Sequence, residues 1–342
     1  MPHSVNWHGK PYYSLDAYCK NTYGEKLWKV SLNAGLSCPN RDGSLGSRGC
    51  IFCSGGGSGD FAVPFYAPPS SGPFGNGNAF ELACQESLAM ISRKNTGQKY
   101  IPYFQAFTNT YGPVPYLERI YRLALSHPLT AGISIATRPD CLPGPVMALL
   151  SKLKAEYAPK FIWVELGLQT IHAPSAAFIR RGYPLSCFDE GLSKLCHAGI
   201  PAVAHVILGL PGETREDMLS TIRYLNSKGP WGIKLQLLHI LKDTDLGRLW
   251  ETDPASCGSF PTAGEYLEAL IGCLEQLRPD MVVHRVTGDA PKNLLLAPKW
   301  SGSKRYVLNL LHKCMKERGS FQGKYYRQGQ NASLPLPVPG NL

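Results

Sequence analysis

The chain has 342 residues, of which 44% are hydrophobic and 18% are charged, and its formal net charge at pH 7 is +10. Such an apolar composition excludes a disordered or coiled-coil protein. No run of eighteen apolar residues occurs, so we expect no transmembrane helix. The first residues lack the apolar stretch of a secretory signal, and the sequence therefore indicates a cytoplasmic protein without membrane contact.

Short strands and helical segments alternate along most of the chain. The expected strands are Leu27–Ser31, Tyr100–Phe107, Gly132–Ala136, Phe161–Leu168, Ala202–Leu208 and Gly232–Leu238. The expected helices are Ala79–Lys94, Tyr116–Ser126, Pro145–Tyr157, Ser186–Ala198, Thr214–Ser227, Gly264–Arg278 and Lys304–Arg318. Because this alternation produces a parallel sheet covered by helices, the sequence predicts an α/β fold, a partial (β/α)6 barrel. In such folds the chemistry lies at the carboxyl ends of the strands.

This pattern divides the chain into four parts. Residues 1–24 form an N-terminal extension and residues 25–265 the barrel core, which contains a Gly-, Pro- and Ser-rich loop over 54–78. Residues 266–327 form a basic C-terminal extension, and residues 328–342 are expected to be a flexible tail.

The positive charge is concentrated near the C-terminus. From Arg285 to Arg327 the chain has ten basic and two acidic residues, so this segment carries +8 of the total +10. A localised excess favours contact with a polyanion. A solvated lysine-rich surface explains the same composition equally well.

Three of the eleven cysteines form a motif. Cys38, Cys50 and Cys53 follow the first strand with the spacing C-x11-C-x2-C. Three thiolates on one loop can ligate three irons of a [4Fe-4S] cluster and leave the fourth iron open. A structural zinc ion needs a fourth ligand nearby, and none follows at suitable spacing. A zinc site and ordinary buried cysteines remain the alternatives, and we expect the other eight cysteines to be small core residues.

The cysteine loop after the first strand resembles the radical S-adenosylmethionine (SAM) superfamily. The long first gap between the cysteines is similar to that of the Elongator-like subgroup of this superfamily. The chain resembles in particular a compact bacterial (MnmL-like) form that lacks an acetyltransferase domain, since the residues after 290 are too few for us to expect that domain. Five further segments share the resemblance: YFQAFTNTYGP (103–113), ATRPDCL (136–142), WVELGLQT (163–170), HVILGLPGET (205–214) and KLQLLHILKDTDL (234–246).

The resemblance implies a partial barrel of the radical SAM type that binds a [4Fe-4S] cluster through Cys38, Cys50 and Cys53. SAM would chelate the fourth iron. An electron from a donor such as flavodoxin or ferredoxin would then cleave SAM to methionine and a 5′-deoxyadenosyl radical. The protein would supply orientation and a dry cavity, and the cofactors the reactivity.

The resemblance also assigns cofactor contacts. Phe52 and Ile207 would pack near the adenine, and Gly209 would let the backbone approach it. The amino end of SAM would lie near three polar residues at the end of the second strand: Gln105, Thr108 and Asn109. Gln169 and Arg181 would contact the methionine carboxylate and ribose, with Arg180 as the adjacent alternative.

Three other candidates come from the position of charged residues. Arg138 and Asp140 end the third strand and could bond the ribose or a substrate. Glu165 lies inside the apolar run FIWVELGL, where an unpaired carboxylate costs several kcal/mol. It therefore needs a ligand or a partner, and an ion pair with Arg138 is the structural alternative. His239, after the sixth strand, is either a satisfied barrel histidine or a proton donor.

The Elongator-like resemblance implies tRNA as the partner, with chemistry at the C5 substituent of the wobble uridine and a link to carboxymethylaminomethyluridine processing. Basic residues interleaved with aromatic ones fit such an RNA surface. The candidate RNA-binding residues are Lys299, Lys304, Arg305, Lys313 and Lys316. Two alternatives remain: a radical SAM enzyme acting on a small molecule or peptide, and a zinc-stabilised RNA-binding protein.

Overall fold

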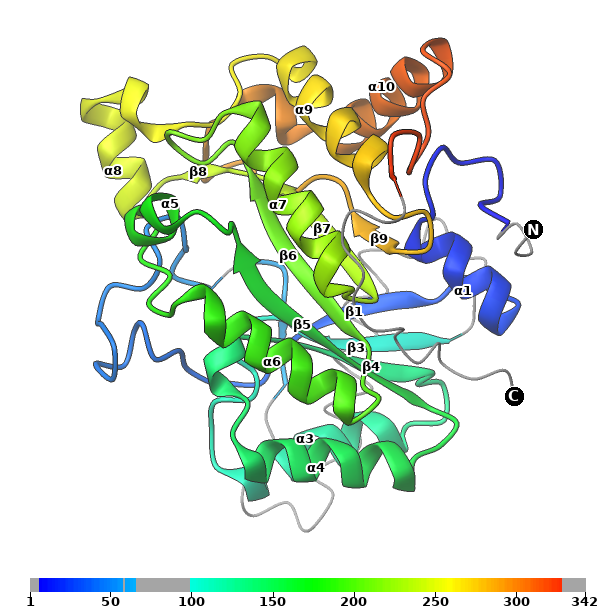
Figure 1. Ribbon diagram of the computed structural model, residues 1–342. Coiled ribbons are helices and arrows are strands. Elements are labelled where there is room, and N and C mark those ends of the chain that lie inside the picture. The colour runs from blue at the N-terminus through cyan, green and yellow to red at the C-terminus, as the bar shows by residue number, and fades with distance from the viewer. Residues whose placement is uncertain (1–5, 58, 66–98, 328–342) are drawn as a thin grey trace.

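The computed structural model describes residues 6–57, 59–65 and 99–327, and eight strands of this part form one parallel sheet (Figure 1). Their order is β2-β1-β3-β4-β5-β6-β7-β9. The strands are β1 (Trp28–Asn33), β2 (Val63–Pro64), β3 (Tyr100–Phe104), β4 (Gly132–Thr137), β5 (Phe161–Gln169), β6 (Ala202–Leu208), β7 (Gly232–Leu237) and β9 (Val282–Arg285). The predicted α/β fold with successive parallel strands is confirmed.

The six predicted strands correspond to β1 and β3–β7, and the two edge strands were missed. β2 has only two residues, which is too short for a recognisable pattern. β9 has four residues and is held in the sheet by its parallel pairing with β7, where Gly232 lies opposite Val282. Short edge strands of this kind depend on a partner that is distant in sequence.

Helices cover the outer face of the sheet, as the alternating pattern predicts. These are α3 (Val114–Ser126), α4 (Gly144–Glu156), α6 (Leu185–His197) and α7 (Arg215–Lys228). The start of α7 is fixed by a capping pair, because Thr214 and Asp217 bond each other's backbone N–H groups. The predicted helix Ala79–Lys94 lies outside the described residues. The short helices α5 (Ala173–Phe178) and α8 (Asp245–Thr252) were not predicted.

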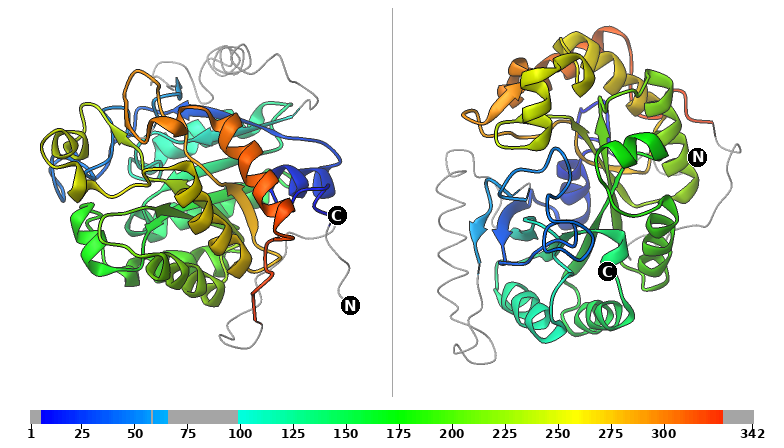
Figure 2. Two further views of the ribbon diagram at one scale, coloured as in Figure 1. Left: turned by 90° about the horizontal axis from the view of Figure 1, so that it is seen from above. Right: turned by 90° about the vertical axis from the view of Figure 1, so that its left-hand side faces the viewer.

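The segments at both ends of the chain pack against this core (Figure 2). They comprise α1 (Leu15–Tyr23), α9 (Ala263–Gln276), α10 (Lys304–Glu317) and β10 (Leu295–Ala297). β10 pairs with β8 (Ile240–Leu241), which follows β7, in a small second sheet. The buried side chain of Gln322 links the two ends, since it accepts a bond from Tyr13 N (2.9 Å) and donates one to Met281 O (2.9 Å). The basic extension, residues 266–327, also contributes a strand to the main sheet, because β9 lies within it and pairs with β7.

The predicted tail, 328–342, is outside the described residues. In the described ranges, no helix has the length and apolar character that a membrane span requires.

The two faces of the sheet differ in polarity. Along β5, Val164, Leu166 and Leu168 belong to the hydrophobic core. Glu165 and Gln169 alternate with them and face a cavity. Because side chains of a strand alternate between faces, this pattern leaves a polar inner face for the site.

Candidate active site

A cavity of about 780 Å³ lies at the inner face of the sheet. All the main strands except the short edge strand β2 contribute to its wall, and several do so with alternate residues, as in Lys29 and Ser31 of β1 or Lys234 and Gln236 of β7. The segments that follow the carboxyl ends of the strands complete it. The cavity therefore lies where the sequence predicts the chemistry.

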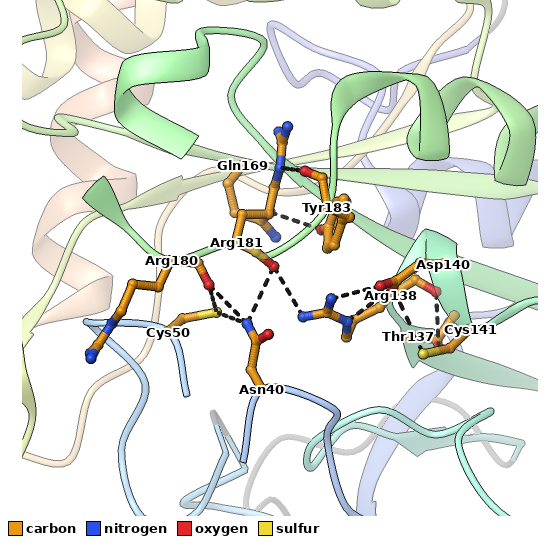
Figure 3. Close-up of polar contacts among 11 residues, drawn as sticks. Asn40, Cys50, Thr137, Arg138, Asp140, Cys141, Gln169, Arg180, Arg181 and Tyr183 are labelled. Carbon is orange, nitrogen blue, oxygen red and sulfur yellow. Dashed lines mark hydrogen bonds and ion pairs between the residues drawn. The ribbon is translucent and has the colours of Figure 1, made fainter. Parts of the chain in front are cut away.

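Cys38, Cys50 and Cys53 all line this cavity. Asn40, a buried residue of the same loop, donates through Nδ2 to the backbone carbonyls of Arg180 (2.8 Å) and Arg181 (3.2 Å) and lies 3.6 Å from Cys50 Sγ (Figure 3). These bonds hold the cysteine loop against the segment after β5.

A second residue of the cysteine loop, Arg41, stabilises the C-terminal end of that loop. Its guanidinium donates to the carbonyls of Cys53 (2.9 Å) and Ser54 (2.6 Å). Neither Arg41 nor Asn40 was predicted, because each acts through backbone groups that no sequence pattern marks. Together they fix the loop that presents the thiols.

Three cysteines in the wall of one cavity are the donor set that an iron–sulfur cluster would need if each cysteine ligated a separate iron. Burial raises the pKa of Cys50 to about 12, and the neighbouring Cys53 adds to this shift. A thiolate at this position therefore needs a bound cation. Within residues 6–57, 59–65 and 99–327, no three His, Cys, Asp or Glu side chains are placed to hold one metal ion.

Arg138 and Asp140 pair with each other at the end of β4. The guanidinium of Arg138 bonds both carboxylate oxygens of Asp140 (2.9 and 2.7 Å) and the carbonyl of Arg181 (3.0 Å), as Figure 3 shows. Arg138 lines the cavity and Asp140 does not. Asp140 thus orients an arginine that faces the cavity.

Arg181 also lines the cavity, and its guanidinium donates to three backbone carbonyls, those of Leu168 (2.9 Å), Thr170 (2.7 Å) and Tyr183 (3.0 Å). Its adjacent alternative, Arg180, instead pairs with Asp245 of α8 (2.5 Å). Of the two arginines, Arg181 is the one at the cavity.

The other predicted cofactor contacts divide into two groups. Those that line the cavity are Phe52, Gln105, Thr108, Gln169 and Ile207. Asn109 and Gly209 do not line it. Asn109 is fully buried and bonds the carbonyl of Ala136 (3.0 Å). Gly209 has φ of +86°, and a Cβ there would lie 2.8 Å from Phe260, so packing of the chain requires a glycine.

Glu165 has the partner that its burial demands, but the partner is not Arg138. The side chain is 0% exposed and bonds Lys29 (2.5 Å), Lys234, His205 (2.7 Å) and Ser134 (2.7 Å). Arg138 follows the end of β4 and takes the nearer carboxylate, Asp140. The predicted ion pair is therefore wrong in its partner.

This cluster controls the charge of Glu165. Burial alone would raise the pKa of the carboxyl, but the ammonium groups of Lys234 and Lys29 hold it well below its ordinary value. Glu165 is therefore a carboxylate at neutral pH. The two lysines escaped prediction although each is a polar residue within a buried strand, a signal that could have found them.

Three histidines line the cavity in the neutral form. Burial lowers the pKa of His205 and of His239 to about 4, and that of His284 well below its ordinary value. His239 Nε2 and both ring nitrogens of His284 have no hydrogen-bond partner in the described part of the chain. Among the described residues, the Nε2 atom of His239 is therefore left without a hydrogen bond.

Because these histidines are neutral in the folded chain, we expect its stability to decrease in acid. An unfolded chain takes up their protons near pH 6.5, whereas the folded chain resists protonation to about pH 4, so stability is full above 6.5 and falls as the pH decreases. We expect the thermal midpoint to decrease between pH 6.5 and 5, and to do so less steeply in His239→Gln. Equal slopes for the variant and the wild type would contradict this.

The rim of the cavity includes part of the basic segment. Lys304, the first residue of α10, pairs with Asp289 (2.8 Å), which also faces Arg285 (3.5 Å), and all three line the cavity. Among the other predicted RNA contacts, Lys299 donates to the carbonyl of Leu295 (2.5 Å). The exposed ones are Arg305, Lys313 and Lys316 on α10.

Family models match most of the chain. The model described as "Radical SAM superfamily" matches residues 44–225, and the one described as "Radical_SAM C-terminal domain" matches residues 230–317. The chain is 39% identical over 326 residues to "Uncharacterized protein YtqA" of Bacillus subtilis (strain 168), covering 95% of each.

Two further similarities concern Elongator proteins. The chain is 30% identical over 168 residues to Elongator complex protein 3 of Danio rerio, covering 48% of this chain and 29% of that one. In structure it resembles an N-terminally truncated Elp3 of Methanocaldococcus infernus with a TM-score of 0.58 and 16% identity, over 77% of this chain and 64% of that one. This second similarity shows a shared fold.

Proposed function

The chain belongs to the radical SAM superfamily, and we propose that it modifies the C5 substituent of the wobble uridine in tRNA, within carboxymethylaminomethyluridine processing. Members of the superfamily use a [4Fe-4S] cluster and SAM. The observation that carries the proposal is the cavity, which has the three cysteines in its wall and basic residues of the C-terminal segment at its rim.

The chain supplies residues for both cofactors. Cys38, Cys50 and Cys53 would hold the cluster, and Asn40 and Arg41 keep their loop in place. When bound, the reduced cluster supplies the electron that cleaves SAM and so provides the radical. The electron comes from a donor, for which we propose flavodoxin or ferredoxin, in the cytoplasm.

We assign SAM to the wall near the cysteines. The residues proposed to contact it directly are Phe52, Gln105, Thr108, Arg138, Gln169, Arg181 and Ile207, all of which line the cavity. Asn109, Asp140 and Gly209 would act by shaping this wall. Arg138 is held by Asp140 and Arg181 by backbone carbonyls, so both guanidinium groups are oriented before a ligand binds.

The tRNA would contact the exposed face of α10 beside the cavity. Arg305, Lys313 and Lys316 are exposed there, and so is the ring of Tyr306. Cations for phosphates and rings for unstacked bases are the two components of single-stranded RNA recognition. This surface would bring the anticodon loop to the rim, where Lys304 lies.

Neutralising this surface is expected to weaken tRNA binding in a salt-dependent way. With Arg305, Lys313 and Lys316 replaced by glutamine, the slope of log affinity against log salt should become shallower by about 2 to 3. The matched control replaces Lys20, Lys152 and Lys228, which lie on other helices. An equal effect of both sets in filter-binding titrations would contradict an α10 surface.

The substrate is tested by analysing tRNA nucleosides. Bulk tRNA from cells that lack the gene should accumulate the carboxymethylaminomethyl nucleoside, and purified enzyme with SAM and reductant should consume it. Unchanged wobble nucleosides in both experiments would refute the proposed substrate. Turnover of SAM by the same preparation with a small molecule or peptide would then identify the alternative radical enzyme.

A further inference from the structure

The floor of the cavity holds a carboxylate with no remaining capacity to accept hydrogen bonds. Oε1 of Glu165 accepts from Lys29 (2.5 Å) and Ser134 (2.7 Å), and Oε2 accepts from Lys234 and His205 (2.7 Å). A carboxylate offers about four lone-pair sites. These four contacts occupy all of them, so Glu165 cannot serve as an acceptor for a ligand.

The two lysines, in contrast, have donors left over. An ammonium group carries three N–H donors. Lys234 uses one for Glu165 and one for the hydroxyl of Tyr103 (2.9 Å), and Lys29 uses one for Glu165 and a long one for Ser134 (3.5 Å). Among the residues that the structure places, no further oxygen or nitrogen accepts from either lysine. Both ammonium groups also lie over the ring of Tyr103 (4.6 and 4.3 Å), which carries no counter-charge, and both line the cavity.

The charges at the floor are also unbalanced. Two amino groups share the single carboxylate of Glu165, and neither has a second carboxylate partner among the residues described. Burial lowers the pKa of Lys234, and Glu165 opposes this shift. An anion at the floor would supply the missing counter-charge and would favour the protonated form of both lysines.

Neighbouring groups do not remove this imbalance. His205 and His284 line the same part of the cavity, and burial keeps both neutral at pH 7. A neutral imidazole has one N–H, and no described residue accepts from His284. The floor is thus rich in donors and net positive when both lysines are protonated.

We propose that Lys29 and Lys234 bind a carboxylate of the substrate at the floor of the cavity. The inference rests on the proposed function, because a carboxymethylaminomethyl substituent ends in a carboxylate. Both lysines lie within their strands, before the carboxyl ends that lead to the cysteine loop and to most residues assigned to SAM. The C5 substituent of the uridine would therefore extend to the floor of the cavity, and its carbon chain would lie between the floor and the cofactors.

The test measures binding of two nucleosides to the reconstituted protein with SAM, under anaerobic conditions by calorimetry. The probes are 5-carboxymethylaminomethyluridine and 5-methylaminomethyluridine, which share the amine and differ in the carboxylate. We expect the wild type to prefer the carboxylate form by about 10- to 100-fold, the range for hydrogen bonds to a charged group. Lys29→Met should reduce this preference to near one, and Lys29→Arg should restore part of it.

Lys29 is chosen because its side chain is 20% exposed and Glu165 keeps Lys234 as its partner, so the fold should persist. Lys152→Met, at an exposed site on α4, is the control. SAM binding is measured in parallel and should not change. No preference in the wild type, a preference retained in Lys29→Met, or a loss of SAM affinity instead would overturn the proposal.

The two proposals can fail separately. A carboxylate preference that depends on Lys29, with no turnover of tRNA, supports the anion site and refutes the tRNA substrate. Turnover of tRNA that is equal for both wobble substituents and unaffected by Lys29→Met supports the tRNA substrate and refutes the anion site.

Discussion

Replacing Cys50 with serine is expected to abolish SAM cleavage and to remove most of the iron from the protein. Cys50 has two neighbours that fix its thiol, the side-chain amide of Asn40 and the carbonyl of Arg180. A serine hydroxyl at this half-buried position is a poor ligand, because it would have to ionise to replace a thiolate. Iron content should fall well below the roughly four atoms per chain of a [4Fe-4S] cluster.

The measurement combines iron and sulfide analysis with detection of 5′-deoxyadenosine after anaerobic reduction. Cys196→Ser is the matched control, since Cys196 is a half-buried thiol on α6, outside the cavity. It should retain both iron and product. If Cys50→Ser kept a full cluster and cleaved SAM, the three-cysteine site would be wrong.

Replacing Glu165 with glutamine is expected to lower the free energy of unfolding by about 3–5 kcal/mol, the range for removing one partner of a buried ion pair. The change leaves Lys29 and Lys234 facing each other without a counter-charge and directs an amide N–H towards one of them. Because the folded-state pKa of Glu165 is lowered, its contribution exists at neutral pH and disappears as acid protonates it.

Chemical denaturation at pH 7 measures this loss, and a double-mutant cycle tests its cause. Glu165→Gln with Lys29→Met should recover part of the lost stability, since one unpaired ammonium group is removed. Lys29→Met alone should have a small effect. A loss below about 1 kcal/mol for Glu165→Gln, the size of an ordinary hydrogen bond, would show that the carboxylate does not anchor the floor.

The fold and the position of the three cysteines beside one cavity were predictable because their signals are local. The strands β1 and β3–β7 are short runs separated by helical segments, and the C-x11-C-x2-C spacing lies in one loop. The burial of Glu165 could be predicted for the same reason, from the apolar residues on either side of it.

The partners of Glu165 could not be predicted, because they depend on how distant strands align. Lys29 is 136 residues away on β1 and Lys234 is 69 residues away on β7. Arg138 was a reasonable candidate by chain position, but it follows the end of its strand and finds Asp140 two residues later. Strand register, and not sequence distance, decides which charges meet.

The role of Asn40 was hidden for a related reason. It appears in the sequence as a polar residue of a turn, and its bonds go to the carbonyls of Arg180 and Arg181, 140 residues away or more. Backbone acceptors carry no residue-specific signal. Supports of a loop are therefore harder to predict than the ligands that the loop presents.

The most direct test of the account is anaerobic SAM cleavage with and without tRNA. The reconstituted and reduced protein is incubated with SAM, and 5′-deoxyadenosine is quantified in the presence and absence of bulk tRNA that carries the carboxymethylaminomethyl substituent. The account predicts product that rises with this tRNA and remains at background with RNase-treated tRNA. No product from a protein that contains zinc in place of iron would contradict the account.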